Sequence, residues 1–409
     1  MLDELEARLE ELRELGLYRR TRLISGPQGP RVVLDGKPVL LLCSNNYLGL
    51  ADHPRVREAA ADAAMRWGVG AGASRLVSGT MTIHRRLEER LADFEGTEAA
   101  LLFGSGYLAN LGAISALASD PGGIVLSDEL NHASIVDGCR LARAETRVYR
   151  HGDVEHLAAL LRDARGRPAV IVTDSVFSMD GDVAPLAELV DVARAHGARL
   201  VVDEAHGTGC LGPGGRGAVA EAGVDGEVDV VVGTLGKALG SYGAYAACSR
   251  TLARWLVNRA RPFIFSTAPP PPAVGAALAA LELLAEQPVR PQRLQANAGV
   301  LRDALAREGF ETAGSTTQIV PLIVGDADVA MAMCEAALAL GVFAQAIRPP
   351  TVAPGTSRLR LAVMATHGKD ELRAAARALG QAALKAGFRP GAGVPLAATH
   401  GMEDVAAAA

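Results

Sequence analysis

Residues 198–209 read ARLVVDEAHGTG, and this stretch decides the fold class. A short apolar run ends at Asp203, and a polar, glycine-containing turn follows it, which is typical of a buried strand that leads into a loop. Similar apolar runs recur along residues 99–234, and segments with helical patterning separate them. The other runs are 99–103 (AALLF), 123–127 (GIVLS), 146–150 (TRVYR), 168–174 (PAVIVTD) and 228–234 (VDVVVGT).

Strands that alternate with helices favour parallel crossovers, because each helix returns the chain to the same edge of the sheet. We therefore predict an α/β domain whose sheet is covered by helices on both faces. Ligands of such sheets bind beyond the carboxyl ends of the strands. The polar residues that follow each apolar run are consequently the candidates for a functional site.

The rest of the chain predicts a second, smaller region. Apolar runs at 318–325, 341–347 and 357–363 lie between helical segments, which indicates an α+β domain. We expect an N-terminal helix and strand segment at 1–50, a large domain at 51–289, a small domain at 290–388 and a flexible tail at 389–409. The acidic N-terminal helix does not resemble an export signal, and prolines interrupt the longest uncharged window, so we expect no transmembrane segment.

Composition limits the class of partner. Of the 409 residues, 49% are hydrophobic and 21% are charged, and the net charge of −5 gives no basic excess for nucleic acid or membrane. The five cysteines are scattered without a CxxC pair, which argues against a disulfide framework or a zinc site. We expect a cytoplasmic protein that binds small molecules and no metal.

Four predicted strand ends carry chemically useful side chains, and a lysine, Lys237, follows a fifth among small residues. The strand-end residues are Asp203 with His206, Asp174 with Ser178, Asn131 with His132, and the turn Gly104, Ser105, Gly106 and Tyr107 before a helix. Singly, each has an ordinary structural explanation: the turn connects strand to helix, Asp203 caps a helix, and His132 and Lys237 are merely solvated or packed.

Taken together, these residues match one ligand. A glycine-rich turn before a helix binds phosphate, a lysine amine forms a Schiff base with an aldehyde, and a buried carboxylate keeps a pyridine nitrogen protonated. Pyridoxal 5'-phosphate (PLP) combines these three groups. Neither the GxGxxG fingerprint of nicotinamide-binding folds nor a P-loop is present in the sequence.

Several longer motifs of the sequence resemble a known family, the α-oxoamine synthases, which are PLP enzymes of fold type I. The resemblance spans about residues 15–386 and is carried by SNNYLGL (44–50), ASRLVSGT (73–80), DSVFSMDGD (174–182), VVDEAHGTGCLG (201–212) and GTLGKALG (233–240). It implies a large domain with a mostly parallel seven-stranded sheet, a smaller α+β C-terminal domain, and homodimers with active sites at the interface.

The resemblance also implies a role for each site residue. Lys237, Asp203 and His132 would be catalytic: Lys237 carries the cofactor and removes a proton, Asp203 pairs with the ring nitrogen, and His132 stacks on the ring and polarises an acyl oxygen. The implied cofactor contacts are Gly106, Tyr107, His132, Ser178, Asp203, His206, Thr234, Lys237 and Thr267, the last from a neighbouring subunit. The implied substrate contacts are Arg19 or Arg20, Asn45, His132, Thr351 and Arg360.

Two sets of alternatives stay open at the residue level. Arg360 is a natural partner for a substrate carboxylate, but Arg358 lies on the same face of the same predicted strand and competes with it. Ser78 and His84 fall in or just after a family-like motif, and we expect only packing or subunit contacts from them.

The implied reaction joins an amino acid to an acyl thioester with loss of CoA and CO2. The sequences of residues 233–249 and 258–271 are similar to those of family members that use L-alanine with pimeloyl-CoA, or a pimeloyl carrier-protein thioester, on the route to biotin. Alternatives are a member that joins glycine to acetyl-CoA, one that accepts several acyl-CoAs, and an aminotransferase. A PLP-binding transcription regulator is poorly supported, because about 40 N-terminal residues cannot hold a DNA-binding domain.

Overall fold

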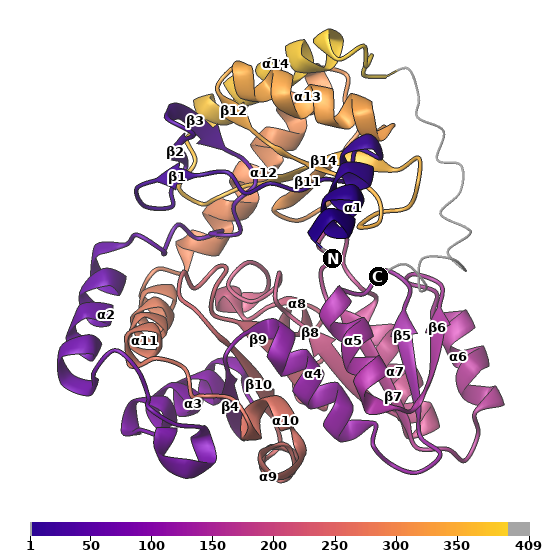
Figure 1. The fold of residues 1–409 in the computed structure, drawn as a ribbon. Coiled ribbons are helices and arrows are strands. Elements are labelled where there is room, and N and C mark those ends of the chain that lie inside the picture. Colours follow the sequence, from indigo (N-terminus) through magenta and orange to yellow (C-terminus); the bar gives the residue numbers. More distant parts are fainter. Residues whose placement is uncertain (1, 392–409) are drawn as a thin grey trace.

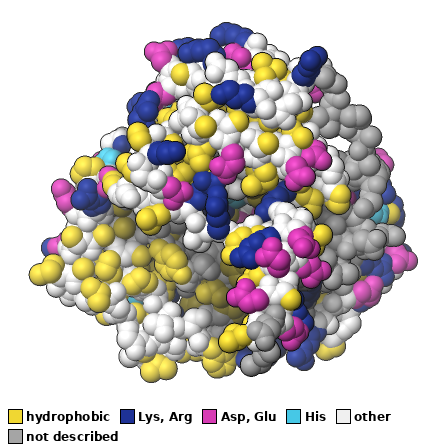
Figure 2. Space-filling model, turned by 45° about the horizontal axis from the view of Figure 1, so that its top comes forward, with side chains coloured by type: hydrophobic (Ala, Val, Ile, Leu, Met, Phe, Trp, Pro, Cys, Tyr) yellow, Lys and Arg dark blue, Asp and Glu magenta, His cyan; other side chains and the backbone are white. Residues whose placement is uncertain are grey.

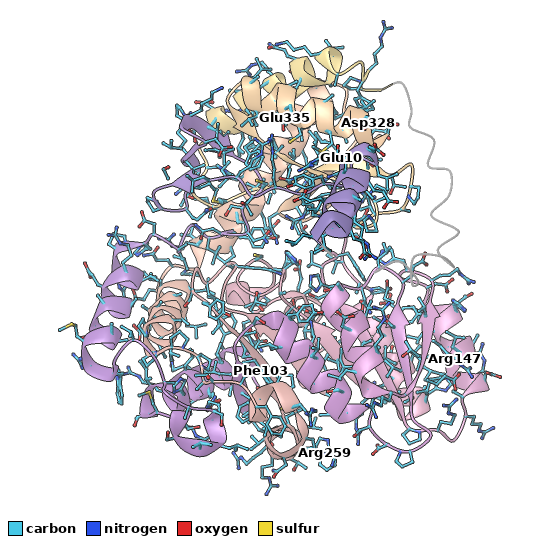
Figure 3. The ribbon with its side chains drawn as sticks, in the orientation of Figure 1. Glu10, Phe103, Arg147, Arg259, Asp328 and Glu335 are labelled. Carbon is cyan, nitrogen blue, oxygen red and sulfur yellow. The ribbon has the colours of Figure 1, made fainter. Side chains whose placement is uncertain are left out.

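A seven-stranded sheet forms the centre of the computed structural model, which describes residues 2–391 (Figure 1). Its strand order is β4-β10-β9-β8-β7-β5-β6. The strands are β4 (Ala99–Phe103), β5 (Ile124–Asp128), β6 (Glu145–Tyr149), β7 (Ala169–Asp174), β8 (Arg199–Asp203), β9 (Val230–Thr234) and β10 (Ala244–Cys248). Phe103 on β4 and Arg147 on β6 mark the two edges in Figure 3.

Six of these strands coincide with the predicted apolar runs, and the mostly parallel α/β sheet is confirmed. Strands β5 to β9 run parallel to one another, whereas β10 is antiparallel to both of its neighbours, β4 and β9. The residues of β8 alternate between two cores, with Leu200 and Val202 in one and Val201 in the other. This alternation is what a sheet buried on both faces requires.

Helices cover both faces of this sheet (Figure 1). One core contains residues of α4 (Gly106–Leu117), α5 (Ala133–Ala142), α9 (Arg250–Arg259) and α10 (Arg261–Ile264). The other contains residues of α3 (Thr82–Glu95), α6 (Val154–Asp163), α7 (Leu186–His196), α8 (Ala218–Glu221) and α11 (Pro271–Glu286). Helix α2 (Pro54–Trp67) packs against α11, and the π-helix η1 (Arg75–Gly79) and the short 3-10 helix η2 (Pro213–Gly215) complete this part of the chain.

The C-terminal region forms a three-stranded antiparallel sheet of order β11-β14-β13, with helices beside it. These elements are β11 (Ile319–Gly325), β13 (Gln345–Ile347), β14 (Ser357–Ala362), α12 (Val289–Arg307), α13 (Ala327–Ala339) and α14 (Lys369–Lys385). The antiparallel sheet and its helices give this region the α+β character expected of it.

The N-terminal segment joins this C-terminal region instead of standing apart (Figure 1). After α1 (Leu2–Glu14) come β1 (Ile24–Ser25), β2 (Arg31–Leu34) and β3 (Lys37–Leu41), and β3 pairs in parallel with β12 (Val342–Phe343). The predicted domain boundaries stay predictions, and residues 392–409 of the predicted flexible tail lie outside the described residues.

Two carboxylates lie at the carboxyl ends of neighbouring strands of the large sheet, and the candidate site forms at this end of the strands. In the register of β7 and β8, Asp174 lies opposite Asp203. Arg360 on β14 of the C-terminal sheet reaches the same region, where its guanidinium bonds to Ser178 just after β7. The site therefore forms where the two sheets meet. Within residues 2–391, no helix is long and apolar enough to cross a bilayer.

Candidate active site

Lys237 lies at the start of a continuous chain of hydrogen bonds. Its Nζ is 2.9 Å from His206 Nε2, and His206 Nδ1 is 2.7 Å from the hydroxyl of Tyr47. Burial lowers the pKa of Lys237 to about 8, while the carboxylates of Asp203 and Asp174 act in the opposite direction. An amine with this pKa is partly neutral near physiological pH, which is the form that attacks an aldehyde or removes a proton.

His206 is kept neutral by its surroundings. Burial holds the pKa of His206 well below its ordinary value, and the positive charges of Lys237 and Arg360 act in the same direction. The side chain of Gln318 donates a hydrogen bond of 2.8 Å to the His206 carbonyl, which fixes the backbone of this residue. The imidazole is therefore a rigid, uncharged hydrogen-bonding group beside the lysine.

Asp203 lies at the end of β8 and both of its carboxylate oxygens accept hydrogen bonds. Oδ1 accepts from the backbone N–H of Ala205 at 2.7 Å, and Oδ2 accepts from Asn110 Nδ2 at 2.6 Å. Asn110 also donates to Ser134 Oγ at 2.9 Å, and this hydroxyl lies 2.7 Å from His132 Nδ1. Asp203 and His132 are thus connected through two buried polar side chains.

The imidazole of His132 is accessible to solvent although protein atoms pack around it. This packing lowers the pKa of His132, Asp203 opposes the shift, and Lys237 reinforces it. The backbone N–H of His132 donates to Asp174 Oδ2 at 2.7 Å, which ties the histidine loop to the end of β7. Burial and the neighbouring Asp203 raise the pKa of Asp174 well above its ordinary range.

Arg360 is a buried cation whose partners are neutral. Its side chain is 7% exposed, and it donates to the carbonyl of Ser178, to Asn45 Oδ1 at 3.3 Å and to the Tyr47 hydroxyl at 3.3 Å. Among the side chains that the structure describes, no carboxylate forms an ion pair with it. Because an arginine has five N–H donors, two remain for a ligand, and a carboxylate is the anion that this fork fits best.

Arg358, the competing candidate, is already paired. Its guanidinium forms an ion pair with Asp180 and also donates to the Met179 carbonyl at 3.4 Å. Both arginines face the same side of β14, as the alternation of a strand predicts. The structure therefore favours Arg360 over Arg358 as the residue that receives a substrate carboxylate.

The glycine-rich turn after β4 has free backbone donors that could hold an anion. Helix α4 begins at Gly106, so the N–H groups of its first turn have no acceptor within the helix. Only the N–H of Leu108 is capped, by Ser105 Oγ at 3.2 Å. A Cβ atom at Gly106 would lie 2.7 Å from Thr234 Cγ2, so the glycine keeps this space open beside the threonine. Backbone donors and a helix N-terminus suit phosphate.

These features fit PLP. The cradle at Gly106 and Thr234 suits its phosphate, Asp203 suits its ring nitrogen, and Lys237 suits its aldehyde. In addition, Asn110 Oδ1 is buried without a hydrogen-bond partner among the described residues, next to the carboxylate of Asp203. The residues that would hold this group are thus present and lie at the ends of β4, β8 and β9.

Several predicted contacts are exposed and stay predictions. Among the described residues these side chains make no hydrogen bond to Lys237, His206 or Arg360; they are Arg19, Arg20, Tyr107, Thr267 and Thr351. The Tyr107 hydroxyl instead bonds to Asp137, which leaves its backbone N–H as the candidate phosphate donor.

The two residues from which only packing was expected differ from one another. His84 is fully buried: its Nε2 lies 2.8 Å from the Pro269 carbonyl, and its Nδ1 accepts from the N–H of Met81 at 3.1 Å. These bonds hold the segment that precedes α11 and give His84 a structural role. Ser78 is exposed on η1.

Sequence reasoning missed Tyr47 and Asn110 as site residues. Both had a signal: Tyr47 stands two residues after Asn45 in the motif SNNYLGL, and Asn110 lies one helical turn after Gly106, on the same face of α4. A polar residue on the inner face of a helix that begins with a phosphate cradle is a reasonable candidate for contact with the ligand.

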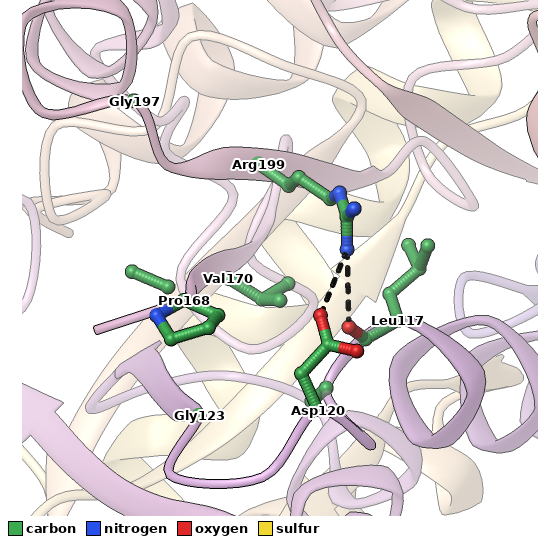
Figure 4. Close-up of a pocket in the computed structure, with 9 residues that line it drawn as sticks. Leu117, Asp120, Gly123, Pro168, Val170, Gly197 and Arg199 are labelled. Carbon is green, nitrogen blue, oxygen red and sulfur yellow. Dashed lines mark hydrogen bonds and ion pairs between the residues drawn. The ribbon is translucent and has the colours of Figure 1, made fainter. Parts of the chain in front are cut away.

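A small cavity of about 120 Å³ lies at the other end of the strands, away from Lys237 (Figure 4). It is lined by residues at the amino ends of β7 and β8, where Arg199 lies 3.8 Å from Asp120 and donates to the Leu117 carbonyl at 3.3 Å. Because ligands of parallel sheets bind at the carboxyl ends, this cavity is separate from the Lys237 site.

Comparisons with known proteins agree with this geometry. The family model described as aminotransferase class I and II matches residues 37–379. An 8-amino-7-oxononanoate synthase from Citrifermentans bemidjiense is 54% identical over 382 residues, covering 93% of this chain and 98% of the relative. Among solved structures, a variant serine palmitoyltransferase from S. paucimobilis with a bound PLP–myriocin aldimine superposes with a TM-score of 0.89 at 34% identity, covering 94% of this chain and 98% of that one. An 8-amino-7-oxononanoate synthase from Francisella tularensis superposes with a TM-score of 0.72 at 26% identity, covering 84% and 97%.

Proposed function

The chain belongs to the aminotransferase class I and II family and, within it, to the 8-amino-7-oxononanoate synthases, which makes it a PLP-dependent acyltransferase of fold type I. From this premise we propose that it condenses L-alanine with pimeloyl-CoA, or with a pimeloyl carrier-protein thioester, to give 8-amino-7-oxononanoate, free thiol and CO2 for biotin synthesis. The observation that carries this proposal is the hydrogen-bonded chain from Lys237 through His206 and Tyr47 to Arg360. This chain connects Lys237, which acts at the amino end of a substrate, to Arg360, which binds a carboxylate, and an amino acid carries both groups.

PLP, when bound, supplies an aldehyde for the amino group and an electron sink for the charge that develops at Cα. Lys237 Nζ then removes the Cα proton, because its pKa of about 8 leaves a neutral fraction near pH 7. The carboxylate of Asp203, held by Asn110 and the Ala205 N–H, would keep the ring nitrogen of the bound group protonated.

Arg360 binds the carboxylate of L-alanine through its two remaining donors and so orients the Cα–H bond. His132, accessible at the site and tied to Asp203 through Ser134 and Asn110, donates a hydrogen bond to the acyl oxygen as the carbon–carbon bond forms, the thioester C–S bond breaks and the thiol leaves. The carboxylate that came from L-alanine then leaves as CO2, and Lys237 returns a proton to the product carbon.

We further propose that two copies of the chain form the active enzyme. Exposed apolar side chains cluster in residues 65–77 and at Phe265, and a bridge between Ser74 and Thr267 brings these two segments together. Figure 2 shows hydrophobic side chains gathered on the side of the molecule where α2 lies in Figure 1. An apolar surface of this kind supports a subunit interface, and it carries Thr267, the predicted phosphate contact of a neighbouring subunit.

The experiment that tests the reaction measures thiol release from pimeloyl-CoA and from acetyl-CoA, with L-alanine or glycine as the amino donor. The proposal predicts that L-alanine with pimeloyl-CoA gives the fastest release and an equal amount of CO2. Preference for glycine with acetyl-CoA would assign the chain to another reaction of the same chemistry. Transamination of pyruvate without thiol release would contradict the acyltransferase assignment.

A further inference from the structure

We propose that Tyr47 is a positioning residue whose buried hydroxyl fixes the Arg360 guanidinium in the orientation that receives the carboxylate of the amino-acid substrate. The inference rests on the proposed function, because it concerns the amino-acid side of that site. Tyr47 lies between the two parts of the molecule: its carbonyl accepts from the N–H of Ala365 at 2.7 Å, and its hydroxyl reaches His206.

The hydroxyl of Tyr47 forms hydrogen bonds with three side chains of the network, and the side chain of Gln318 also lies close enough to act on it. The hydroxyl lies 2.7 Å from His206 Nδ1, 3.0 Å from Asn45 Oδ1 and 3.3 Å from Arg360 Nη2. Arg360 can only donate, so the Tyr47 oxygen accepts from it. The oxygen has one proton to give, and Asn45 Oδ1 has none, so the proton of Tyr47 goes to Asn45.

This arrangement also determines the proton position on His206. With the Tyr47 proton directed to Asn45, His206 Nδ1 carries a proton and donates it to the tyrosine oxygen. His206 Nε2 is then left as an acceptor for Lys237, at 2.9 Å. The hydroxyl therefore bonds directly to the arginine side of the site and reaches the lysine side only through His206.

Tyr47 is suited to a fixed role because its side chain is fully buried and its hydroxyl stays protonated. Its side chain is 0% exposed. Burial raises the pKa of Tyr47 to about 12, against the opposing charge of Arg360, so the hydroxyl keeps its proton over the working pH range. Asn45 Oδ1 accepts from both Tyr47 and Arg360, which closes a three-membered hydrogen-bond network around the guanidinium.

The test replaces Tyr47 by Phe, which keeps the packed ring and removes only the oxygen. Tyr149→Phe is the matched control, because Tyr149 is also 0% exposed and its hydroxyl takes no part in this network. For both variants and the wild type, the dissociation constant of PLP is measured by titration of the apoprotein, and that of L-alanine by titration of the PLP-loaded protein. The melting temperature of each protein is recorded as well.

We expect Tyr47→Phe to raise the dissociation constant of L-alanine at least about ten-fold, since a hydrogen bond to a charged group is lost, and to change that of PLP less than about three-fold. Tyr149→Phe should change neither. Unchanged L-alanine binding in Tyr47→Phe, or equal losses for L-alanine and PLP, would overturn the proposal. If the wild type binds glycine but not L-alanine, the proposed reaction fails, and Tyr47 is tested with glycine, which presents the same carboxylate.

Discussion

At the scale of the residue, strand periodicity predicted that Arg358 and Arg360 share a face, but it gave no means to choose between them. The choice depends on Asp180, which lies in a loop after β7 and pairs with Arg358. No local pattern relates residues 178 positions apart, so only the structure assigns one arginine to the fold and the other to the ligand. Lys237, Asp203 and His206 were predictable because they directly follow apolar strands.

The lowered pKa of Lys237 predicts how the apoprotein captures PLP. Only the neutral amine attacks an aldehyde, so the capture rate should increase about ten-fold per pH unit below the pKa and level off above pH 8. The measurement follows the visible absorbance after mixing apoprotein with PLP between pH 6 and 10. Nα-acetyl-lysine, with the same PLP, is the control for ionisation of the reagent, and its rate should continue to rise up to about pH 10.4. A protein rate that rises in parallel with this control would refute a lowered pKa.

At the scale of the element, the hairpin at residues 175–184 attaches the large sheet to the C-terminal sheet. A bridge between Val176 and Val183 forms it, the Gly181 carbonyl accepts from Thr317 Oγ1 at 2.9 Å, and the Ser178 carbonyl accepts from Arg360. The motif DSVFSMDGD identified the segment, but its attachments come from residues more than 130 positions away. Strand β10 was not predicted, because most of its residues are alanine and alanine does not indicate a strand.

Gly181 should be essential to this hairpin. Its φ is +71°, and a Cβ atom would lie 2.2 Å from the Ile319 carbonyl oxygen. Gly181→Ala should therefore lower the free energy of unfolding by more than the roughly 1–2 kcal/mol that the left-handed conformation alone costs, because backbone must also shift. The control is Gly166→Ala, where φ is +84° and no atom lies within 4 Å of the Cβ position. Denaturant unfolding measures both variants, and equal losses would show that the contact with Ile319 is unimportant.

At the scale of the whole molecule, the sequence predicted the helix-covered α/β sheet and the α+β region, because long periodic segments encode both. It did not predict that β3 pairs with β12, which joins the N-terminal segment to the C-terminal region. A two-residue strand such as β12 has no periodicity to detect, and its partner lies 302 positions earlier in the register of Val342 with Leu40. Contacts of this kind follow from the packed fold.

The exposed apolar surface predicts association of two chains. Sedimentation equilibrium should give a mass of twice the 42.4 kDa of one chain. Val77→Asp places a charge where the side chain is 80% exposed in the single chain, and it should shift the mass toward the monomer. Leu384→Asp, at a position on α14 that is 65% exposed, is the control and should leave the dimer intact. A wild-type protein that stays monomeric at micromolar concentration would exclude this interface.

We propose that the site is built around a covalent link between Lys237 and PLP. The most direct measurement reduces the PLP-loaded protein with borohydride, digests it and locates the added mass by peptide mass spectrometry. We predict that the added mass is found on Lys237 and that the Lys237→Ala variant, treated identically, carries none. Modification of Lys37, Lys369 or Lys385 with Lys237 unmodified would show that Lys237 does not carry the cofactor.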